Sequence, residues 1–195
     1  SGTLLPSEIH GMARGMEQEW KMTGLLPPSP WVTRWASLLP PGGAVLDIAA
    51  GSGRHSRFLL AGGHRVTAVD IDTGRLADLA NHPLAAVRQA DLENGPWPFP
   101  GECFAAVIVT NYLWRPLLPV LRDSVASGGA LIYETFAVGQ ERFGKPSQPD
   151  FLLRPGELLD WVRGRFEVRA YERGADPGPP PAMRQRIAAV RTAAG

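Results

Sequence analysis

The chain has 195 residues, of which 44% are hydrophobic and 20% charged, a composition typical of one globular domain with a sizeable core. Its formal net charge is +1, and no basic stripe with interleaved aromatics is visible, so neither nucleic acid nor an anionic membrane is favoured as a partner. The single Cys103 excludes an internal disulfide framework, and no apolar run reaches the roughly 18 residues that span a bilayer. With no secretory signal at its start, the chain is expected to be cytoplasmic.

Predicted elements alternate along most of the chain. Residues 7–24 favour a helix, which the prolines of "LLPPSPW" (25–31) end, and residues 1–30 are interpreted as an N-terminal helical lid. Ser29 and Pro30 begin a further helix as N-cap and first helical residue. Beyond "PPGG" the pattern predicts strands at 44–49, 64–71, 84–91, 104–112 and 130–136, and helices at 54–61, 73–82 and 116–126.

This alternation is typical of βαβ units in a parallel sheet covered on both faces. A helix at 155–163 and two strands at 165–174 and 183–191 follow, and their short connection makes these two strands an antiparallel pair. The prediction is a single α/β domain over residues 1–195, with a mostly parallel seven-stranded sheet and an antiparallel C-terminal hairpin in a three-layer sandwich. Residues 137–154 are polar and too long for a bare connection, which indicates a lid or binding loop.

The stretch "VLDIAAGSGRHS" (45–56) reads as a buried strand, a turn of small residues and the start of a helix. Gly51 and Gly53 allow a ligand to approach the backbone, and the helix that begins near Arg54 directs free N–H groups to the same place. Taken alone, the Gly51 and Gly53 pattern is also consistent with a turn that has only a packing role and binds no ligand.

Three acids end adjacent predicted strands: Asp47, Asp70 and Asp91. Open α/β sheets bind ligands at this edge, although single acids are common where strands meet solvent. A pyrophosphate is disfavoured because Ser56 stands where the dinucleotide motif needs a third glycine or alanine, and because Asp47 lies just under the turn. A ligand with adenine, ribose and an ammonium-bearing tail fits better, and S-adenosylmethionine is such a ligand.

The motifs "VLDIAAGSGRHS", "VTAVDID", "VRQADLENGPWPF", "FAAVIVTNYL" and "GGALIYETF" resemble, in order and spacing, those of class I S-adenosylmethionine-dependent methyltransferases, closest to small bacterial members. The resemblance covers residues 44–136 and implies a Rossmann-like fold whose reversed seventh strand is the closing hairpin. Ala49 stands where the family often has a glycine, and we expect it to be accommodated by a negative φ.

The resemblance implies a cofactor site made of Asp47, Ala49, Gly51, Gly53, Arg54, Asp70, Ile71, Asp91, Leu92, Asn111 and Tyr112. Asp47 would hold the amino group, Asp70 the ribose hydroxyls, and Asp91 the adenine edge. Asn111 and Tyr112 would lie beneath the sulfonium. Arg54 either reaches the cofactor carboxylate or is a solvated side chain.

The expected reaction is in-line methyl transfer to a small molecule, which leaves S-adenosylhomocysteine, and no metal is expected. Glu134, His55 and Tyr112 are the candidate bases for a neutral acceptor. Each has a structural alternative: an ion pair or loop cap, a surface helix histidine, and a pocket wall, respectively. The 137–154 insertion is expected to cover the acceptor, with Phe143, Lys145 and Phe151 as contacts.

Two other functions remain open at this point. One is a non-catalytic S-adenosylmethionine-binding sensor or partner subunit. The other is an NAD-dependent oxidoreductase, which Asp47, Ser56 and the missing second nucleotide-binding half disfavour.

Overall fold

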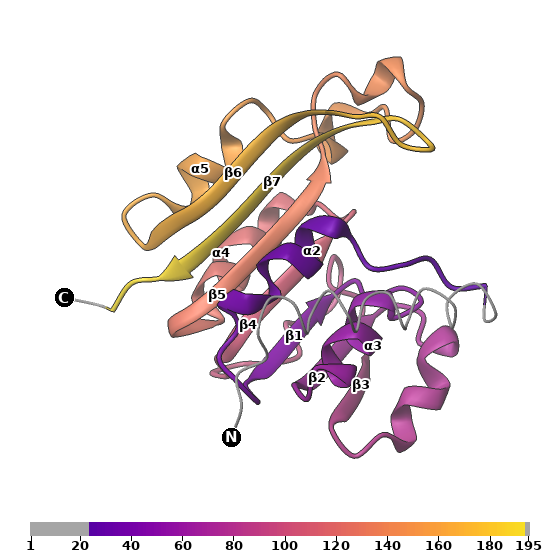
Figure 1. Cartoon of the computed structure of the whole chain (residues 1–195), viewed down its shortest axis with the longest axis vertical. Helices are drawn as coiled ribbons and strands as arrows, with labels where there is room; N and C mark the ends of the chain where they lie inside the picture. The colour runs from indigo at the N-terminus through magenta and orange to yellow at the C-terminus, as the bar shows by residue number, and fades with distance from the viewer. Residues whose placement is uncertain (1–23, 194–195) are drawn as a thin grey trace.

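The computed structural model describes residues 24–193, which contain one seven-stranded sheet (Figure 1). The strands are β1 (Ala44–Ile48), β2 (Arg65–Asp70), β3 (Ala85–Gln89), β4 (Phe104–Thr110), β5 (Val125–Phe136), β6 (Phe166–Asp176) and β7 (Ala182–Arg191). Their order is β3-β2-β1-β4-β5-β7-β6, and only the pairings of β7 with β5 and β6 are antiparallel. The mostly parallel sheet with its antiparallel hairpin is therefore confirmed. The predicted 7–24 helix, and with it most of the predicted 1–30 lid, lies outside the described residues.

The connections between strands are short helices and turns. The α-helices are α2 (Pro30–Trp35), α3 (Arg54–Ala61), α4 (Leu118–Asp123) and α5 (Glu157–Val162). The 3-10 turns are η1 (Ala36–Leu38), η2 (Gly74–Asn81), η3 (Arg115–Leu117), η4 (Gln140–Arg142) and η5 (Pro149–Phe151). Within residues 24–193, no helix is long and apolar enough to cross a membrane.

The alternation of side chains along the strands divides the core into two layers. Leu46 and Ile48 of β1 pack with residues of α4 and α5, whereas Val45 packs with residues of α2 and α3. Figure 1 shows α2 in front of the sheet and α4 behind it. Asp47 lies on the same face of the sheet as Val45, so its carboxylate points toward α3. The three-layer arrangement therefore fixes the position of Asp47, the first of the three acids.

Two segments differ from the prediction. Residues 73–82 favour an α-helix, but 74–81 form a 3-10 turn, in which Leu76 and Leu79, three residues apart, are both buried. Strand β5 begins at Val125, five residues earlier than the predicted 130, and the helix before it ends at Asp123. The pairing of β5 with β4 shifts register between Phe104 and Ala106, and this bulge takes up the extra residues around Gly128 and Gly129.

Candidate functional site

The glycine turn after β1 adopts the left-handed conformation that glycine favours. Gly51 and Gly53 have φ values of +56° and +74°, and Gly53 is the N-cap of α3. A Cβ on Gly53 would lie 2.6 Å from Leu76 Cδ2, whereas one on Gly51 would meet no described atom within 4 Å. Gly53 is therefore needed for packing, and Gly51 leaves open space beside the turn.

 Ala49 has a φ of +51°, not the negative φ expected from the sequence. In this region the Cβ of an L residue approaches the following carbonyl oxygen, at a cost of about 1–2 kcal/mol. Ala49 also packs against the hydrophobic core, which helps to hold the turn in this conformation.

Asp47 is a buried carboxylate with one oxygen in use. Its Oδ2 accepts a hydrogen bond of 2.6 Å from Ser56 Oγ, whereas Oδ1 is buried and has no hydrogen-bond partner among the described residues. Burial raises the pKa of Asp47 to about 6, although the hydrogen bonds from Ser56 and the charge of Arg54 act in the opposite direction. An unpaired buried acceptor is costly, so this oxygen suits a ligand that donates hydrogen bonds or carries positive charge.

Asp70 ends β2 on the other side of the glycine turn. Its Oδ2 accepts a hydrogen bond of 2.8 Å from Gly51 N–H, and its Oδ1 accepts one of 3.0 Å from Asp72 N–H. The carboxylate is thereby fixed beside the open space at Gly51, and each oxygen keeps a lone pair for a further donor. Ile71, which follows, is 62% exposed and offers an apolar surface there.

Asp91 lies beyond the end of β3, where it closes a turn. Its Oδ1 accepts hydrogen bonds from Glu93 N–H and Asn94 N–H, each 3.0 Å long, and its Oδ2 accepts one from the Asn94 side chain. These hydrogen bonds from Asn94 and Glu93 lower the pKa of Asp91. Leu92 packs against the core. Asp91 is thus more fully occupied by its own loop than Asp70 is.

Asn111 and Tyr112 were predicted to end the fourth strand, but β4 ends at Thr110 and both residues follow it. Asn111 has a φ of +53°, and its Oδ1 accepts a 2.5 Å hydrogen bond from Arg184 Nη1. The Tyr112 hydroxyl is buried without a partner among the described residues. Burial raises the pKa of Tyr112, and the nearby charges of Glu93 and Asp91 raise it further, so the phenol stays protonated at neutral pH.

A cavity of about 350 Å³ lies at this end of β4 and β5, within the size range of small-molecule sites. Its lining residues include Glu93, Asn111, Tyr112, Phe136, Pro146 and Phe151. Of the contacts predicted from the insertion, Phe151 lines the cavity. Lys145 does not, but its neighbour Pro146 does, and Phe143 is 42% exposed. The cavity therefore joins the strand ends to the 137–154 insertion.

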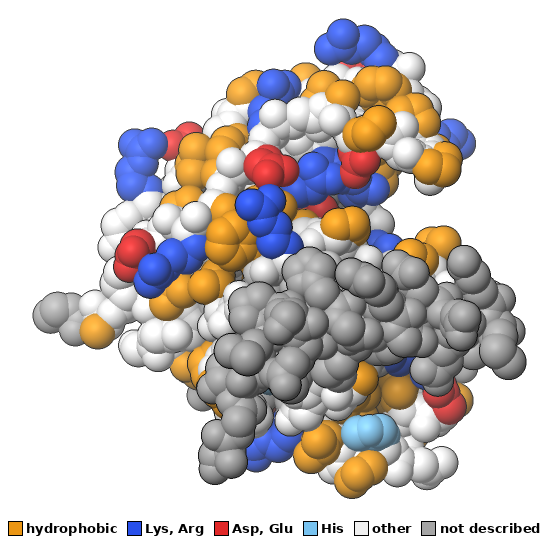
Figure 2. All heavy atoms as spheres, in the orientation of Figure 1, with side chains coloured by type: hydrophobic (Ala, Val, Ile, Leu, Met, Phe, Trp, Pro, Cys, Tyr) orange, Lys and Arg blue, Asp and Glu red, His pale blue; other side chains and the backbone are white. Residues whose placement is uncertain are grey.

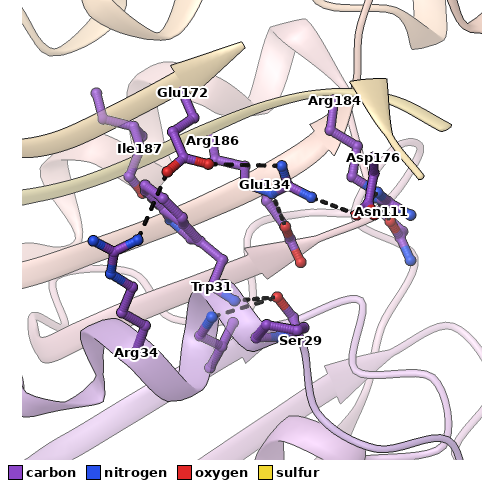
Figure 3. Close-up of polar contacts among 12 residues, drawn as sticks. Ser29, Trp31, Arg34, Asn111, Glu134, Glu172, Asp176, Arg184, Arg186 and Ile187 are labelled. Atoms are coloured by element: carbon purple, nitrogen blue, oxygen red, sulfur yellow. Dashed lines mark hydrogen bonds and ion pairs between the residues drawn. The ribbon is translucent and has the colours of Figure 1, made fainter. Parts of the chain in front are cut away.

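Glu134 forms a buried ion pair at the end of β5. Its Oε2 lies 2.7 Å from Arg186 Nε of β7, and Arg186 Nη2 lies 2.7 Å from Asp176 Oδ2 (Figure 3). Figure 2 shows basic and acidic side chains gathered on this face where β6 and β7 run. This ion pair is the structural alternative considered for Glu134. The carboxylate that was predicted as a candidate base is therefore already bound to Arg186.

His55 and Arg54 begin α3 but lie in different surroundings. His55 is buried, its Nε2 accepts a 3.0 Å hydrogen bond from Ser29 N–H, and its Nδ1 lies 3.3 Å from Thr110 Oγ1. Burial lowers the pKa of His55 to about 3, so the ring is neutral and links α2 to α3 rather than lying on the surface. Arg54 Nη1 donates to Pro27 O, and its pKa is lowered by burial and raised by the charge of Glu134.

Arg184 and Arg186 are site residues that the sequence analysis did not identify. They are two apart in β7, so both side chains project from one face of the sheet, opposite β5 residues 134–136. The signal was present in "MRQRI" as two basic residues at strand spacing. Its meaning depends on the pairing of β7 with β5, which the sequence pattern did not specify.

A parallel sheet with a reversed strand, a glycine turn and acids at the ends of β1 and β2 defines a Rossmann-like nucleoside-binding architecture. Residues 45–129 match the family model described as a methyltransferase domain. The malonyl-[acyl-carrier protein] O-methyltransferase of Serratia marcescens is 34% identical over 139 residues, which cover 67% of this chain and 49% of that protein. The chain therefore spans about half the length of this relative.

Two solved structures show the same fold. TehB from Haemophilus influenzae superposes with a TM-score of 0.72 at 17% identity, over 89% of this chain and 65% of that one. The 1,6-didemethyltoxoflavin-N1-methyltransferase of Burkholderia thailandensis gives a TM-score of 0.59 at 18% identity, over 99% and 93% of the two chains. The chain belongs to the class I S-adenosylmethionine-dependent methyltransferases, as the sequence motifs indicated. The predicted cofactor, S-adenosylmethionine, is the one that defines this family.

Proposed function

We propose that this protein transfers a methyl group from S-adenosylmethionine to a small-molecule acceptor. The observation that carries the proposal is the pair of acids around the glycine turn. Asp47 presents a buried, unpartnered oxygen, and Asp70 holds Gly51 N–H at 2.8 Å beside open space. The first suits an ammonium group and the second suits ribose hydroxyls, so the residues fit the cofactor. S-adenosylmethionine, when bound, supplies an electrophilic methyl group on a good leaving group.

The roles proposed for the other residues follow from their positions. Ala49, Gly51 and Gly53 are assigned to the methionyl and ribose groups, and Arg54, which begins α3 after the turn, to the carboxylate of the methionyl tail. Ile71, Asp91 and Leu92 border the adenine. Asn111 and Tyr112 border both the cofactor and the cavity of about 350 Å³, which we assign to the acceptor.

In this arrangement the chain accelerates the reaction mainly by holding the acceptor in line with the methyl group, about 3–3.5 Å away. One similar structure supports a small acceptor in general terms, because it was solved with 1,6-didemethyltoxoflavin and S-adenosylhomocysteine bound. The curated relative is named for an acceptor carried on a protein, malonyl-[acyl-carrier protein]. We also infer that the chain acts as one domain and that residues 137–154 cover the acceptor, since Pro146 and Phe151 line the cavity.

The test is thermal unfolding with S-adenosylmethionine, S-adenosylhomocysteine or NAD. At a ligand concentration near 100 times its dissociation constant, binding adds about 2.7 kcal/mol, or roughly 5–10 °C in Tm. The expected result is such a shift with either sulfur nucleoside and none with NAD. A shift with NAD alone would overturn the proposal in favour of an oxidoreductase.

Catalysis is separated from a binding-only role by the product. An active enzyme forms S-adenosylhomocysteine in an acceptor-dependent manner, which mass spectrometry detects. A sensor binds the cofactor and forms none with any acceptor.

A further inference from the structure

Arg184 carries a positive charge that the described residues do not neutralise directly. Among residues 24–193, the only carboxylate within 4.0 Å of its guanidinium is that of Asp176, whose Oδ2 lies 4.0 Å from Nε. The same oxygen lies 2.7 Å from Arg186 Nη2, so it is already engaged. Within that part of the chain the Arg184 guanidinium makes one hydrogen bond, to Asn111 Oδ1, although it has five N–H donors.

The position of Arg184 links this spare charge to the cavity. Its guanidinium carbon lies 4.5 Å from the centroid of the Phe136 ring, and both Phe136 and Asn111 line the cavity. Figure 3 shows Arg184 extending from β7 beside Asn111. The Arg184 side chain is only 18% exposed, and its burial lowers its pKa. Arg184 is not itself among the residues that line the cavity, but it contacts two that are, and a partly buried cation with free donors beside a cavity favours an anionic ligand.

The three candidate bases lead to the same class of acceptor. Glu134 is paired with Arg186, and both ring nitrogens of His55 face partners within the fold. Tyr112 remains a protonated phenol at neutral pH. A neutral acceptor needs a base to remove its proton, whereas an acceptor that is already an anion needs none.

We propose that the methyl acceptor is a carboxylic acid bound as its carboxylate by Arg184, an inference that rests on the proposed function. One carboxylate oxygen accepts hydrogen bonds from Arg184, and the other forms the new bond to the methyl carbon. The carbon–sulfur bond breaks, and its electron pair goes to sulfur. The sulfonium and the carboxylate lose their opposite charges together, the product is a methyl ester, and no proton is transferred.

A carboxylate fits these surroundings better than a phosphate or an amine. A planar carboxylate matches the donor geometry of one guanidinium. A phosphate monoester has a second negative charge, which the Glu93 carboxylate in the cavity lining would repel. A protonated amine would be repelled by Arg184, and none of the three candidate bases is available to deprotonate it. The ring of Phe136 and the partly exposed ring of Phe151 provide an apolar surface for the body of the acid.

The experiment separates the cofactor from the acceptor. Binding of S-adenosylhomocysteine is first measured by calorimetry for the wild type, Arg184→Met, Arg184→Lys and Arg169→Gln. Each protein is then incubated with methyl-tritiated S-adenosylmethionine and a panel of acetate, malonate, benzoate and phenylacetate, with the matching amides and phenethylamine in parallel. Methyl esters release volatile tritiated methanol in mild alkali, whereas N-methyl products do not.

The expected result is alkali-labile label with at least one acid and none with the amides or the amine. Arg184→Met should raise KM for that acid by about 10–100-fold with a smaller effect on kcat, because a charge-assisted hydrogen bond is lost. Arg184→Lys should recover part of the loss. Arg169→Gln, which removes an exposed arginine paired with Glu167 on β6, should match the wild type.

The inference is overturned if S-adenosylhomocysteine binds but no acid is labelled, if the label is stable to alkali, or if Arg184→Met leaves KM unchanged. Absence of S-adenosylhomocysteine binding in the wild type would instead overturn the proposed function, and the inference with it.

Discussion

At the carboxyl edge of the sheet, the acids at β1 and β2 have different partners from the acids near the end of β5 and the C-terminal hairpin. At β1 and β2 the acids stand without basic partners in direct contact, and their neighbours are backbone N–H groups and Ser56. At β5 and β6 the acids Glu134 and Asp176 are paired with Arg186 of β7, and Arg184 is left without a close carboxylate among the described residues. The first half is suited to a ligand that donates hydrogen bonds and carries positive charge, and the second to an anion. In the proposed reaction, the sulfonium nucleoside would therefore bind at the β1–β2 half and the carboxylate acceptor at the arginine half.

The largest expected effect tests the cofactor half. Asp70→Ala should weaken S-adenosylhomocysteine binding by at least about 100-fold, because hydrogen bonds from two hydroxyls to a charged acceptor are lost. Asp91→Ala should weaken it by less than about 10-fold, since that carboxylate is already occupied by Glu93 and Asn94. Calorimetry measures both, and circular dichroism checks that each variant folds. Equal losses would remove the distinction between the two acids.

The next effect tests the paired acids of the other half. Glu134→Ala leaves Arg186 buried with only part of its counter-charge and should lower the free energy of unfolding by about 3 kcal/mol. Arg184→Met breaks no close ion pair and should lower it by less than about 1 kcal/mol. Urea denaturation gives both values. If the Arg184 variant lost as much free energy of unfolding as the Glu134 variant, Arg184 would be needed for folding and would not be available to bind a ligand.

The raised pKa of Asp47 should make the stability of the ligand-free protein depend on pH. Its pKa is about 6 in the fold and 3.8 as the reference value, so between these values the folded state binds more protons than the unfolded state. Stability from this group is therefore gained as pH falls from 7 toward 4, by about 3 kcal/mol. Asp47→Asn should remove this component, which appears as the difference between the two unfolding profiles.

The same carboxylate should give cofactor binding the opposite trend. An ammonium group favours charged Asp47, so affinity for S-adenosylhomocysteine should decrease as pH falls below 6. Calorimetry from pH 5 to 8 measures this change, and Asp47→Asn should bind more weakly with a flatter profile. An affinity independent of pH in the wild type would contradict the role given to Asp47.

The smallest expected effect concerns the turn between the two halves. Ala49→Gly should stabilise the protein by up to about 1 kcal/mol, because glycine adopts a φ of +51° without the Cβ contact. Ala50→Gly is the matched control. Ala50 is not among the residues with positive φ, so glycine there should destabilise by about 1 kcal/mol. Denaturation midpoints compare the two, and a loss at both positions would show that the turn at Ala49 is not strained.

The cofactor half was largely predictable because its signals are local. The apolar strand before Asp47, the glycines after it and the acid that ends β2 lie close together in sequence, and each has its own physical pattern. The sign of φ at Ala49 was missed, because a small residue in a turn does not reveal its backbone conformation. The environment of His55 was missed as well, since a histidine in the first turn of a helix gives no sign that Ser29 and Thr110 enclose it.

The arginine half depends on contacts between distant segments. Glu134 and Arg186 are 52 residues apart and meet because β7 pairs with β5 in a register that places them opposite one another. A shift of one residue would turn Arg184 and Arg186 to the other face of the sheet. The predicted hairpin fixes the pairing of β6 with β7 but not which of them borders β5, so neither arginine was recognised from sequence.

The insertion after β5 has ends that lie side by side. Ala137 pairs with Leu153, Val138 N–H donates to Leu153 O, and Leu153 N–H donates to Phe136 O. The residues between them form a closed excursion that can lengthen, shorten or change composition while the sheet keeps its register. Evolution can therefore vary this excursion independently of the strands beneath it, and homologous chains that diverge most here would be expected to differ in what they methylate while keeping the same methyl donor.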